Sequence, residues 1–266
     1  VNPKGALLEN TFSEWYAGPF NDGGEDDKTC QDCHMPAYEG EIVAGVRKTI
    51  HKHTFVGVDL ALVEDFPDRE EQRRLVEELL RSAAELDVER VPDQQNSLAI
   101  RATVKNVNNG HALPSGSTAD RQVWVHLIVR DMAGEVVYES GMLDANGDLM
   151  DRVEGHSLDP SGDPELLLFG SLLFDEEGEH VTFPWEAKRS QDFLIQPGQI
   201  AWREYLIPYA ELEGTSAVTV ETRLLYRTFP PFLVRALIDE GFLKEDELPF
   251  GIPIVEMARE TMMISL

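Results

Sequence analysis

The sequence predicts an α+β fold, in which a small helical and loop-rich part precedes an antiparallel β-sandwich of the immunoglobulin-like or a related type. Residues 1–93 contain short helical segments, loops and one long amphipathic helix. After Pro92 the apolar residues change to a period of two, which is typical of half-buried strands. Turn residues separate these strands at short intervals, as in antiparallel sandwiches. We therefore expect two domains, residues 1–93 and residues 94–266.

The elements of the first part follow from local patterns. Glu9–Tyr16 suits a short helix, and Asn21–Lys28 reads as a flexible acidic loop because it is rich in Gly and Asp. Asp68–Asp87 carries apolar residues at helical spacing, which predicts an amphipathic helix. Pro67 precedes this helix and Pro92 follows it, as is common at helix boundaries.

The second part is expected to be mostly strand. Pro230–Leu243 reads as a short helix because prolines open it, and Ile252–Leu266 is apolar enough to form a final strand or a covering segment. The other segments alternate apolar and polar residues. The predicted strands are Ser97–Val107, Arg121–Asp131, Val136–Leu143, Asp192–Gly198, Ile200–Tyr209 and Ala217–Phe229.

The segment DANGDLMD resembles a calcium-binding loop only in part. Asp144, Asn146 and Asp148 have the spacing of the first three calcium ligands of an EF-hand. However, Leu149 and Gly155 stand where an EF-hand needs Gly and Glu. A hairpin turn at Asn146-Gly147 is the better interpretation.

Charge and hydropathy exclude two classes of partner. The chain has 49 acidic and 23 basic residues and a net charge of −26, so a nucleic acid would be repelled. No apolar run reaches the roughly 20 residues that a transmembrane helix needs. The acidic surface is either an ordinary solvated surface or a face that attracts a basic redox partner. Because the chain begins with Val1, we expect a processed protein whose signal sequence has been removed.

The segment TCQDCHMP contains both cysteines of the chain, Cys30 and Cys33, followed directly by His34. A disulfide across two residues would stabilise little, because the loop it closes is very small. A zinc site would need His51 and His53 as further ligands, but their spacing is tighter than in zinc fingers. Thioredoxin-like thiol chemistry would need a βαβ context. Covalent haem attachment uses all three residues: two thioethers and one imidazole ligand to iron. Haem c is therefore favoured, with zinc and thiol chemistry as alternatives.

Four segments in order resemble the C-terminal part of multihaem c-type cytochromes. They are Glu9–Trp15, Cys30–Pro36, His53–Gly57 and Gly110–Gly116, and the helix Asp68–Asp87 stands between the last two as it does in that family. The resemblance covers most of the chain. It departs from the family pattern at Ser115, where the family has Thr, and in having one Cys-x-x-Cys-His motif instead of several. Either the protein is a monohaem relative, or upstream haems lie on another chain or on a missing segment.

The resemblance implies a c-type cytochrome that transfers single electrons through one covalently bound haem c and is not an enzyme. Its expected partners are redox proteins, including other cytochrome subunits, in an oligomer or larger assembly. The expected location is periplasmic or extracellular. Two alternatives stay open: a five-coordinate haem enzyme or sensor, and an interaction subunit whose haem is structural. The sequence sets neither the reduction potential nor the electron donor and acceptor.

The ligand opposite His34 decides whether the iron is open to small molecules. His53 is the first candidate, since it lies in the family's His-x-Phe-x-Gly segment, where Phe55 would pack on the porphyrin. His51 is its neighbour and rival. His111 is the second candidate, because Gly, Pro and Gly residues fix the path of its loop, and it would bind this haem or one on a neighbouring chain.

The remaining candidates have weaker support. His126 alternates with apolar residues and should point outward from its strand, whereas His156 and His180 lie in acidic loops and should be solvated. Possible donors to the haem propionates are Arg47, Lys48, Lys52 and Arg121, and possible residues at the haem edge are Trp15, Tyr16 and Met35.

Overall fold

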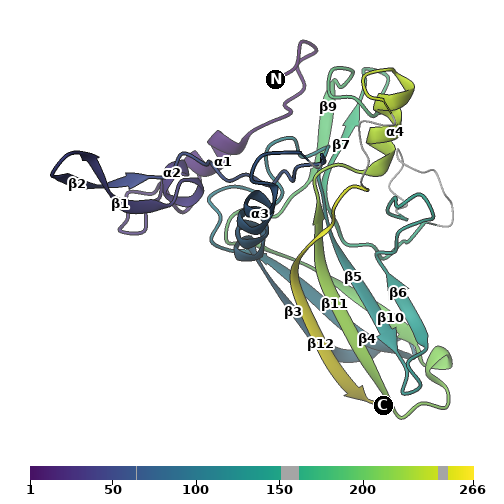
Figure 1. Ribbon diagram of the computed structural model, residues 1–266. Helices are drawn as coiled ribbons and strands as arrows, with labels where there is room; N and C mark the ends of the chain where they lie inside the picture. Colours follow the sequence, from purple (N-terminus) through teal and green to yellow (C-terminus); the bar gives the residue numbers. More distant parts are fainter. Residues whose placement is uncertain (64, 151–161, 245–250) are drawn as a thin grey trace.

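The computed structural model describes residues 1–63, 65–150, 162–244 and 251–266 (Figure 1). It confirms an α+β fold with sandwich-like antiparallel sheets. The helices are α1 (Thr11–Tyr16), α2 (Cys30–His34), α3 (Arg69–Ala83) and α4 (Pro231–Asp239), with a 3-10 turn η1 at Tyr209–Leu212. The strands are β1 (Ala37–Val43), β2 (Val46–His51), β3 (Ala84–Gln94), β4 (Ser97–Asn106), β5 (Gln122–Arg130), β6 (Val136–Ser140), β7 (Leu168–Phe174), β8 (His180–Val181), β9 (Arg189–Phe193), β10 (Ile200–Pro208), β11 (Ala217–Arg227) and β12 (Val255–Ser265).

Two sheets form the body of the molecule. One has the strand order β10-β4-β3, and the larger one has the order β12-β11-β5-β7-β8, with β6 added on β5 and β9 on β7. Alternate residues of β4, β5, β10 and β11 meet between the sheets. The sandwich core is therefore formed by the apolar residues that recur at every second position of these strands. Fully buried core side chains include Leu98, Ile100, Val125, Leu127, Tyr205 and Leu224.

The long helix is confirmed, but it ends earlier than expected. α3 stops at Ala83, and Ala84–Gln94 continues directly as β3, which pairs with β4. The predicted helix over residues 84–87 is therefore wrong. Leu86 and Val91 are buried on the same strand, and pairing with β4 outweighs the helical spacing of the local sequence. The predicted division near residue 93 falls at the end of β3.

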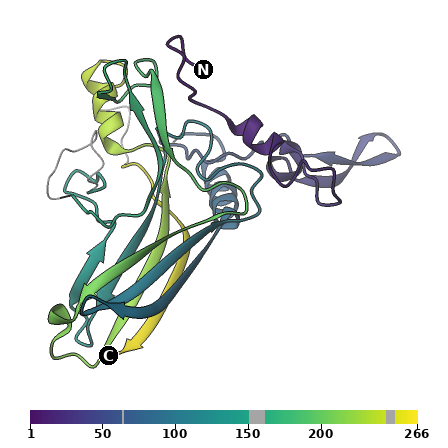
Figure 2. The same ribbon diagram turned by 180° about the vertical axis from the view of Figure 1, so that it is seen from behind.

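A β-hairpin replaces the loop that was expected after the cysteines. β1 and β2 pair only with each other, and Gly45 turns the chain with a positive φ of 81°. The two strands expose most of their residues. Together with α1 and α2 they form a unit, residues 11–57, that projects sideways from the sandwich (Figures 1 and 2). We call this the projecting unit.

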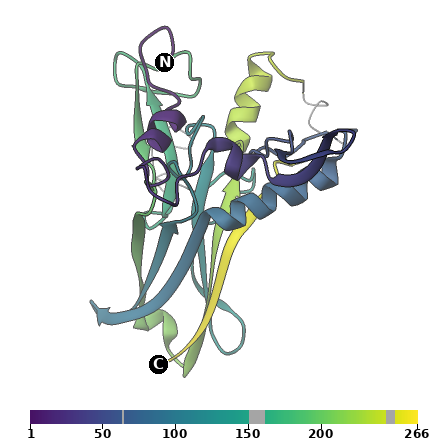
Figure 3. The ribbon, with the colours of Figure 1, turned by 90° about the vertical axis from the view of Figure 1, so that its left-hand side faces the viewer.

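α3 runs across the direction of the long strands (Figure 3) and packs against β12 and β3. Val76 and Leu80 on its inner face are buried, and both belong to the main core cluster. Its outer face carries ion pairs such as Arg74–Glu71 and Arg74–Glu78, as a solvated face does. Within the described ranges, no helix has the length and apolar character to cross a membrane.

The turn at Asn146-Gly147 is confirmed. Gly147 has a φ of 81°, and its N–H donates to the Asp144 carbonyl. Gly155 and His156 lie outside the described residues. Asp148 is not a free ligand, because it accepts hydrogen bonds from the Phe232 N–H and the Arg235 guanidinium and so holds the start of α4.

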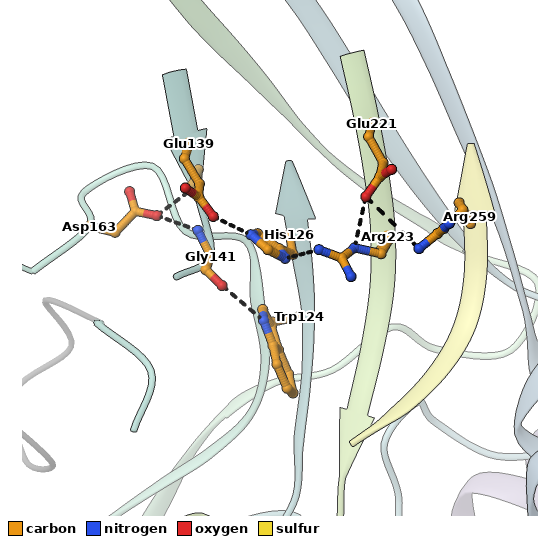
Figure 4. Close-up of polar contacts among 9 residues, drawn as sticks. Trp124, His126, Glu139, Gly141, Asp163, Glu221, Arg223 and Arg259 are labelled. Carbon is orange, nitrogen blue, oxygen red and sulfur yellow. Dashed lines mark hydrogen bonds and ion pairs between the residues drawn. The ribbon is translucent and has the colours of Figure 1, made fainter. Parts of the chain in front are cut away.

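His126 lies on the outer face of the larger sheet, as predicted, but it is paired (Figure 4). Its Nε2 donates to Glu139 at 2.7 Å, and its Nδ1 accepts from Arg223 at 3.0 Å. Arg223 also pairs with Glu221 at 3.3 Å, which extends the polar row across β6, β5 and β11. This histidine therefore has a structural role. His180 differs from the prediction, because it lies half-buried in β8 with its ring edge on Phe174.

Candidate functional site

The cysteine motif forms a short helix that brings its three key side chains onto one face. Cys30, Cys33 and His34 occupy positions i, i+3 and i+4 of α2. The Asp32 carboxylate accepts from both the N–H and the hydroxyl of Thr29, at 2.7 and 2.8 Å, and so closes the first turn. The same hydrogen bonds, that from the N–H first, lower the pKa of Asp32. Both cysteines are exposed and unbridged.

The ring of His34 is fixed from one side by the segment after the hairpin. Its Nδ1 donates to the Val56 carbonyl at 2.5 Å, which leaves the Nε2 lone pair free. The Val56 N–H donates in turn to the His34 carbonyl at 3.1 Å. The Phe55 ring lies nearly parallel to the imidazole, with ring centres 5.1 Å apart. Phe55 has a φ of 39°, an uncommon conformation for a bulky residue, and it keeps 56% of its surface exposed.

His111 is held rigidly by the sandwich. Its loop joins β4 to β5, and the buried Asn106 side chain donates to the His111 carbonyl at 2.9 Å and to the Ile195 carbonyl at 2.8 Å. Leu113 forms an antiparallel bridge with Ile195. The His111 Nδ1 donates to the Ala112 carbonyl at 3.0 Å, so its Nε2 is also free to bind a metal.

Glu14 joins α1 to this loop, and sequence reasoning assigned it no role. Its carboxylate accepts from the Ala112 N–H at 3.0 Å and from the Ser115 hydroxyl at 2.7 Å. Gly18 follows α1, and a Cβ there would come within 2.8 Å of the Gly110 carbonyl, so only glycine allows this approach. Glu14 lies within the Glu9–Trp15 segment of the resemblance, and that was the only available signal for it.

The imidazole rings of His34 and His111 lie near each other and are almost parallel. The ring centres of His34 and His111 are 6.4 Å apart, and the ring planes differ by 10°. Imidazole–metal bonds of about 2 Å place the ring centres of a bis-histidine metal centre about 6 Å apart. The observed distance between the ring centres is close to that value. Together with two thiols on the same helix face, this donor set fits a covalently attached haem.

Electrostatics favours a neutral His111. Burial, more than any nearby charge, lowers the pKa of its imidazole, with smaller contributions from His34 and Arg121. A neutral imidazole is the form that binds a metal. The pKa of the Cys33 thiol is raised, because the sulfur is partly desolvated although the residue as a whole is exposed. A raised thiol pKa is the opposite of what a catalytic thiolate needs.

The other predicted ligands lie elsewhere. His53 is exposed, and in the described part of the chain no hydrogen bond or ring contact joins it to His34. The Nδ1 of His51 donates to the Met35 carbonyl at 2.6 Å. Over the described residues, no three His, Cys, Asp or Glu side chains form a metal-binding group, so the structure does not assemble the Cys2His2 alternative.

Of the predicted propionate donors, Arg121 lies beside the His111 loop, where its guanidinium donates to the Ser115 carbonyl. Arg47 and Lys48 lie exposed on β2, and Lys52 is exposed just after that strand. Trp15 packs close to Gly110, and its indole N–H donates to the Lys28 carbonyl at 2.8 Å. Tyr16 is exposed, and Met35 is half-buried at the end of α2.

Comparison with known proteins finds similarity among solved structures. No protein-family model and no curated protein matches the chain. The fold is similar to the crystal structure of a penta-haem cytochrome c552 from Thermochromatium tepidum, with a TM-score of 0.60 and 23% sequence identity. The chain has a multihaem-cytochrome-like fold. The match covers 99% of this chain and 52% of the other, so the chain spans about half the length of this neighbour.

Replacing Glu14 by alanine should lower the free energy of unfolding by about 1–3 kcal/mol, because the fully buried N–H of Ala112 would lose its acceptor. Denaturant unfolding of the purified protein measures this change. Glu25→Ala is the matched control, since Glu25 is an exposed carboxylate in the acidic loop. Equal losses of stability in the two variants would show that Glu14 does not hold the His111 loop.

Proposed function

We propose that this protein is a c-type cytochrome that transfers single electrons through one haem c, with His34 and His111 as the two axial ligands. The observation that supports this most strongly is the pair of parallel imidazoles, each with a free Nε2, beside two exposed cysteines. Cys30 and Cys33 would form the thioethers. The haem would supply one-electron redox chemistry when bound.

The residues around the proposed haem then each have a definite role. The Val56 and Ala112 carbonyls hold the two imidazoles in the tautomer that presents Nε2, and they raise the basicity of the ligands. Phe55 covers the ring of His34. The Arg121 guanidinium, close to the His111 loop, is suited to receive a propionate. Two strong ligands leave no open position, which is why we propose electron transfer and not catalysis.

We propose His111 in preference to His53 as the ligand opposite His34. The segment that contains His53 lies on the Nδ1 side of His34, where the Val56 carbonyl and the Phe55 ring support the ligand. His111 approaches from the sandwich, on a loop that the sheets hold in place. In this proposal the sandwich acts as the rigid support for the second ligand.

We further propose that the protein works with other haem proteins, in the periplasm or outside the cell, where haem c is attached. The similar structure is a penta-haem protein about twice as long. The projecting unit also exposes several large apolar side chains, as interfaces do. These are Phe12, Tyr16, Tyr38, Ile42, Val43, Val46 and Phe55.

The absorption spectrum of the reduced protein, recorded with and without carbon monoxide, tests this function. Two imidazole ligands should give a low-spin spectrum that carbon monoxide leaves unchanged. A potentiometric titration should show a single one-electron transition. A spectrum that shifts with carbon monoxide would favour a five-coordinate haem enzyme or sensor instead.

A further inference from the structure

A pocket of about 390 Å³ opens into the body at the end where β7, β9 and the start of β10 come together. This volume is in the range of small-molecule sites. The lining is mainly apolar and comes from both sides of the sandwich. Its larger apolar side chains include Leu166, Leu168, Phe169, Phe193 and Leu194. All the residues discussed above for the haem site, apart from Arg121, lie outside this lining.

Of the two arginines that line the pocket, Arg203 comes from the core-side row of β10. Tyr205 and Ile207 on this strand are fully buried, and Arg203 belongs to the same alternating row. The neighbouring residues Trp202 and Glu204 face outward, where both meet Arg101 of β4. Arg203 is therefore an arginine that points toward the space between the sheets.

Arg203 has no close counter-charge, although the protein is strongly acidic. In the described part of the chain its guanidinium makes one contact, to the Pro164 carbonyl at 3.5 Å, and no carboxylate lies within 4.0 Å of it. The carboxylates on either side of Pro164 are already engaged. Asp163 accepts from Ser140 and Gly141, and Glu165 accepts from Tyr138.

The other polar groups of the pocket are already bonded. The Gln122 side-chain oxygen accepts from Arg227, and the Ser171 hydroxyl donates to Asp192 at 2.7 Å. The Arg121 guanidinium is directed to the Ser115 carbonyl. Arg203 is half-buried, and in the described part of the chain its guanidinium thus has N–H groups left for a ligand.

We propose that this pocket binds a small amphipathic anion. The apolar body of the ligand lies among the leucine and phenylalanine side chains, and its carboxylate or sulfonate pairs with Arg203. The guanidinium fork is suited to such a planar or tetrahedral anionic group. Asp192 also lines the pocket and disfavours a ligand with a second negative group. The site shares Arg121 with the surroundings of the proposed haem but none of the proposed haem ligands.

Isothermal titration calorimetry with two matched probes tests the site. The anionic probe is 8-anilinonaphthalene-1-sulfonate, and the neutral probe is N-phenyl-1-naphthylamine, which has the same rings without the sulfonate. One molecule of the anion should bind per chain. Arg203→Met should weaken this binding by about tenfold or more, because a charge-assisted hydrogen bond is lost, and it should leave the neutral probe almost unaffected.

Arg130→Met is the matched control, since Arg130 is an exposed arginine at the end of β5 that donates only to the Gly134 carbonyl among described residues. It should change neither affinity. Ala201→Phe should exclude both probes by filling the pocket, with the circular dichroism spectrum confirming the fold. The proposal is overturned if wild type binds no anion, if Arg203→Met binds it as wild type does, or if Arg130→Met loses as much affinity.

Discussion

Replacing Cys30 and Cys33 together by serine should abolish covalent haem attachment completely. These are the only cysteines in the sequence, so no other thiol can form the thioethers. The haemochrome spectrum in alkaline pyridine, measured after acid–acetone extraction, reports covalently bound haem, and the intact mass of the chain reports its number. Wild type should carry one haem per chain and the double variant none.

The single variant Cys33→Ser is the control for this experiment, because it leaves one thiol on the same face of α2. It should retain haem through one thioether, with a haemochrome band shifted by the remaining vinyl group. Wild-type protein without covalent haem would contradict the proposed function directly. Zinc bound through Cys30 and Cys33 would then be the alternative to examine by elemental analysis.

Replacing His111 by alanine should convert the haem from a low-spin to a high-spin form that binds carbon monoxide. The variant removes one of two imidazoles whose ring centres lie 6.4 Å apart, so the iron would lose one strong ligand. The absorption spectra of the oxidised and reduced protein measure this change. Added imidazole should restore the low-spin spectrum, which a general loss of structure would not allow.

His53→Ala is the matched control for the ligand, because His53 is exposed and belongs to the segment that supports His34. Its spectrum should remain that of wild type. If His53→Ala becomes high-spin and His111→Ala does not, the ligand pair proposed here is wrong. If both become high-spin, the segment around Phe55 contributes more to the position of His34 than its hydrogen bonds and ring contact with that residue indicate.

Much of the sandwich could be predicted because its strands alternate strongly. β4, β5, β10 and β11 were all expected, and each places alternate residues in the core. β3 was missed because it continues α3 without a turn residue between Ala83 and Ala84. The hairpin β1–β2 was missed because most of its residues are exposed on both faces, so no alternation of buried and exposed positions marks it in the sequence.

The candidate site, too, could be predicted from the sequence only in part. The roles proposed for Cys30, Cys33 and His34 rest on spacing along a few residues, and the structure places these residues on one helical turn. The partner of His34 depends on contacts between distant segments. Asn106 and Glu14 set the position of the His111 loop, and neither contact leaves a local signal. The resemblance to the family's His-x-Phe-x-Gly segment favoured His53, whereas the fold places the ring of His111 near that of His34.

The near-infrared magnetic circular dichroism spectrum of the oxidised wild-type protein tests the central claim most directly, because its low-spin charge-transfer band reports the two axial ligands of the iron. With His34 and His111 bound, we predict the band position of a bis-imidazole haem. A band at the position of histidine–methionine ligation, or a high-spin spectrum with no such band, would contradict the account.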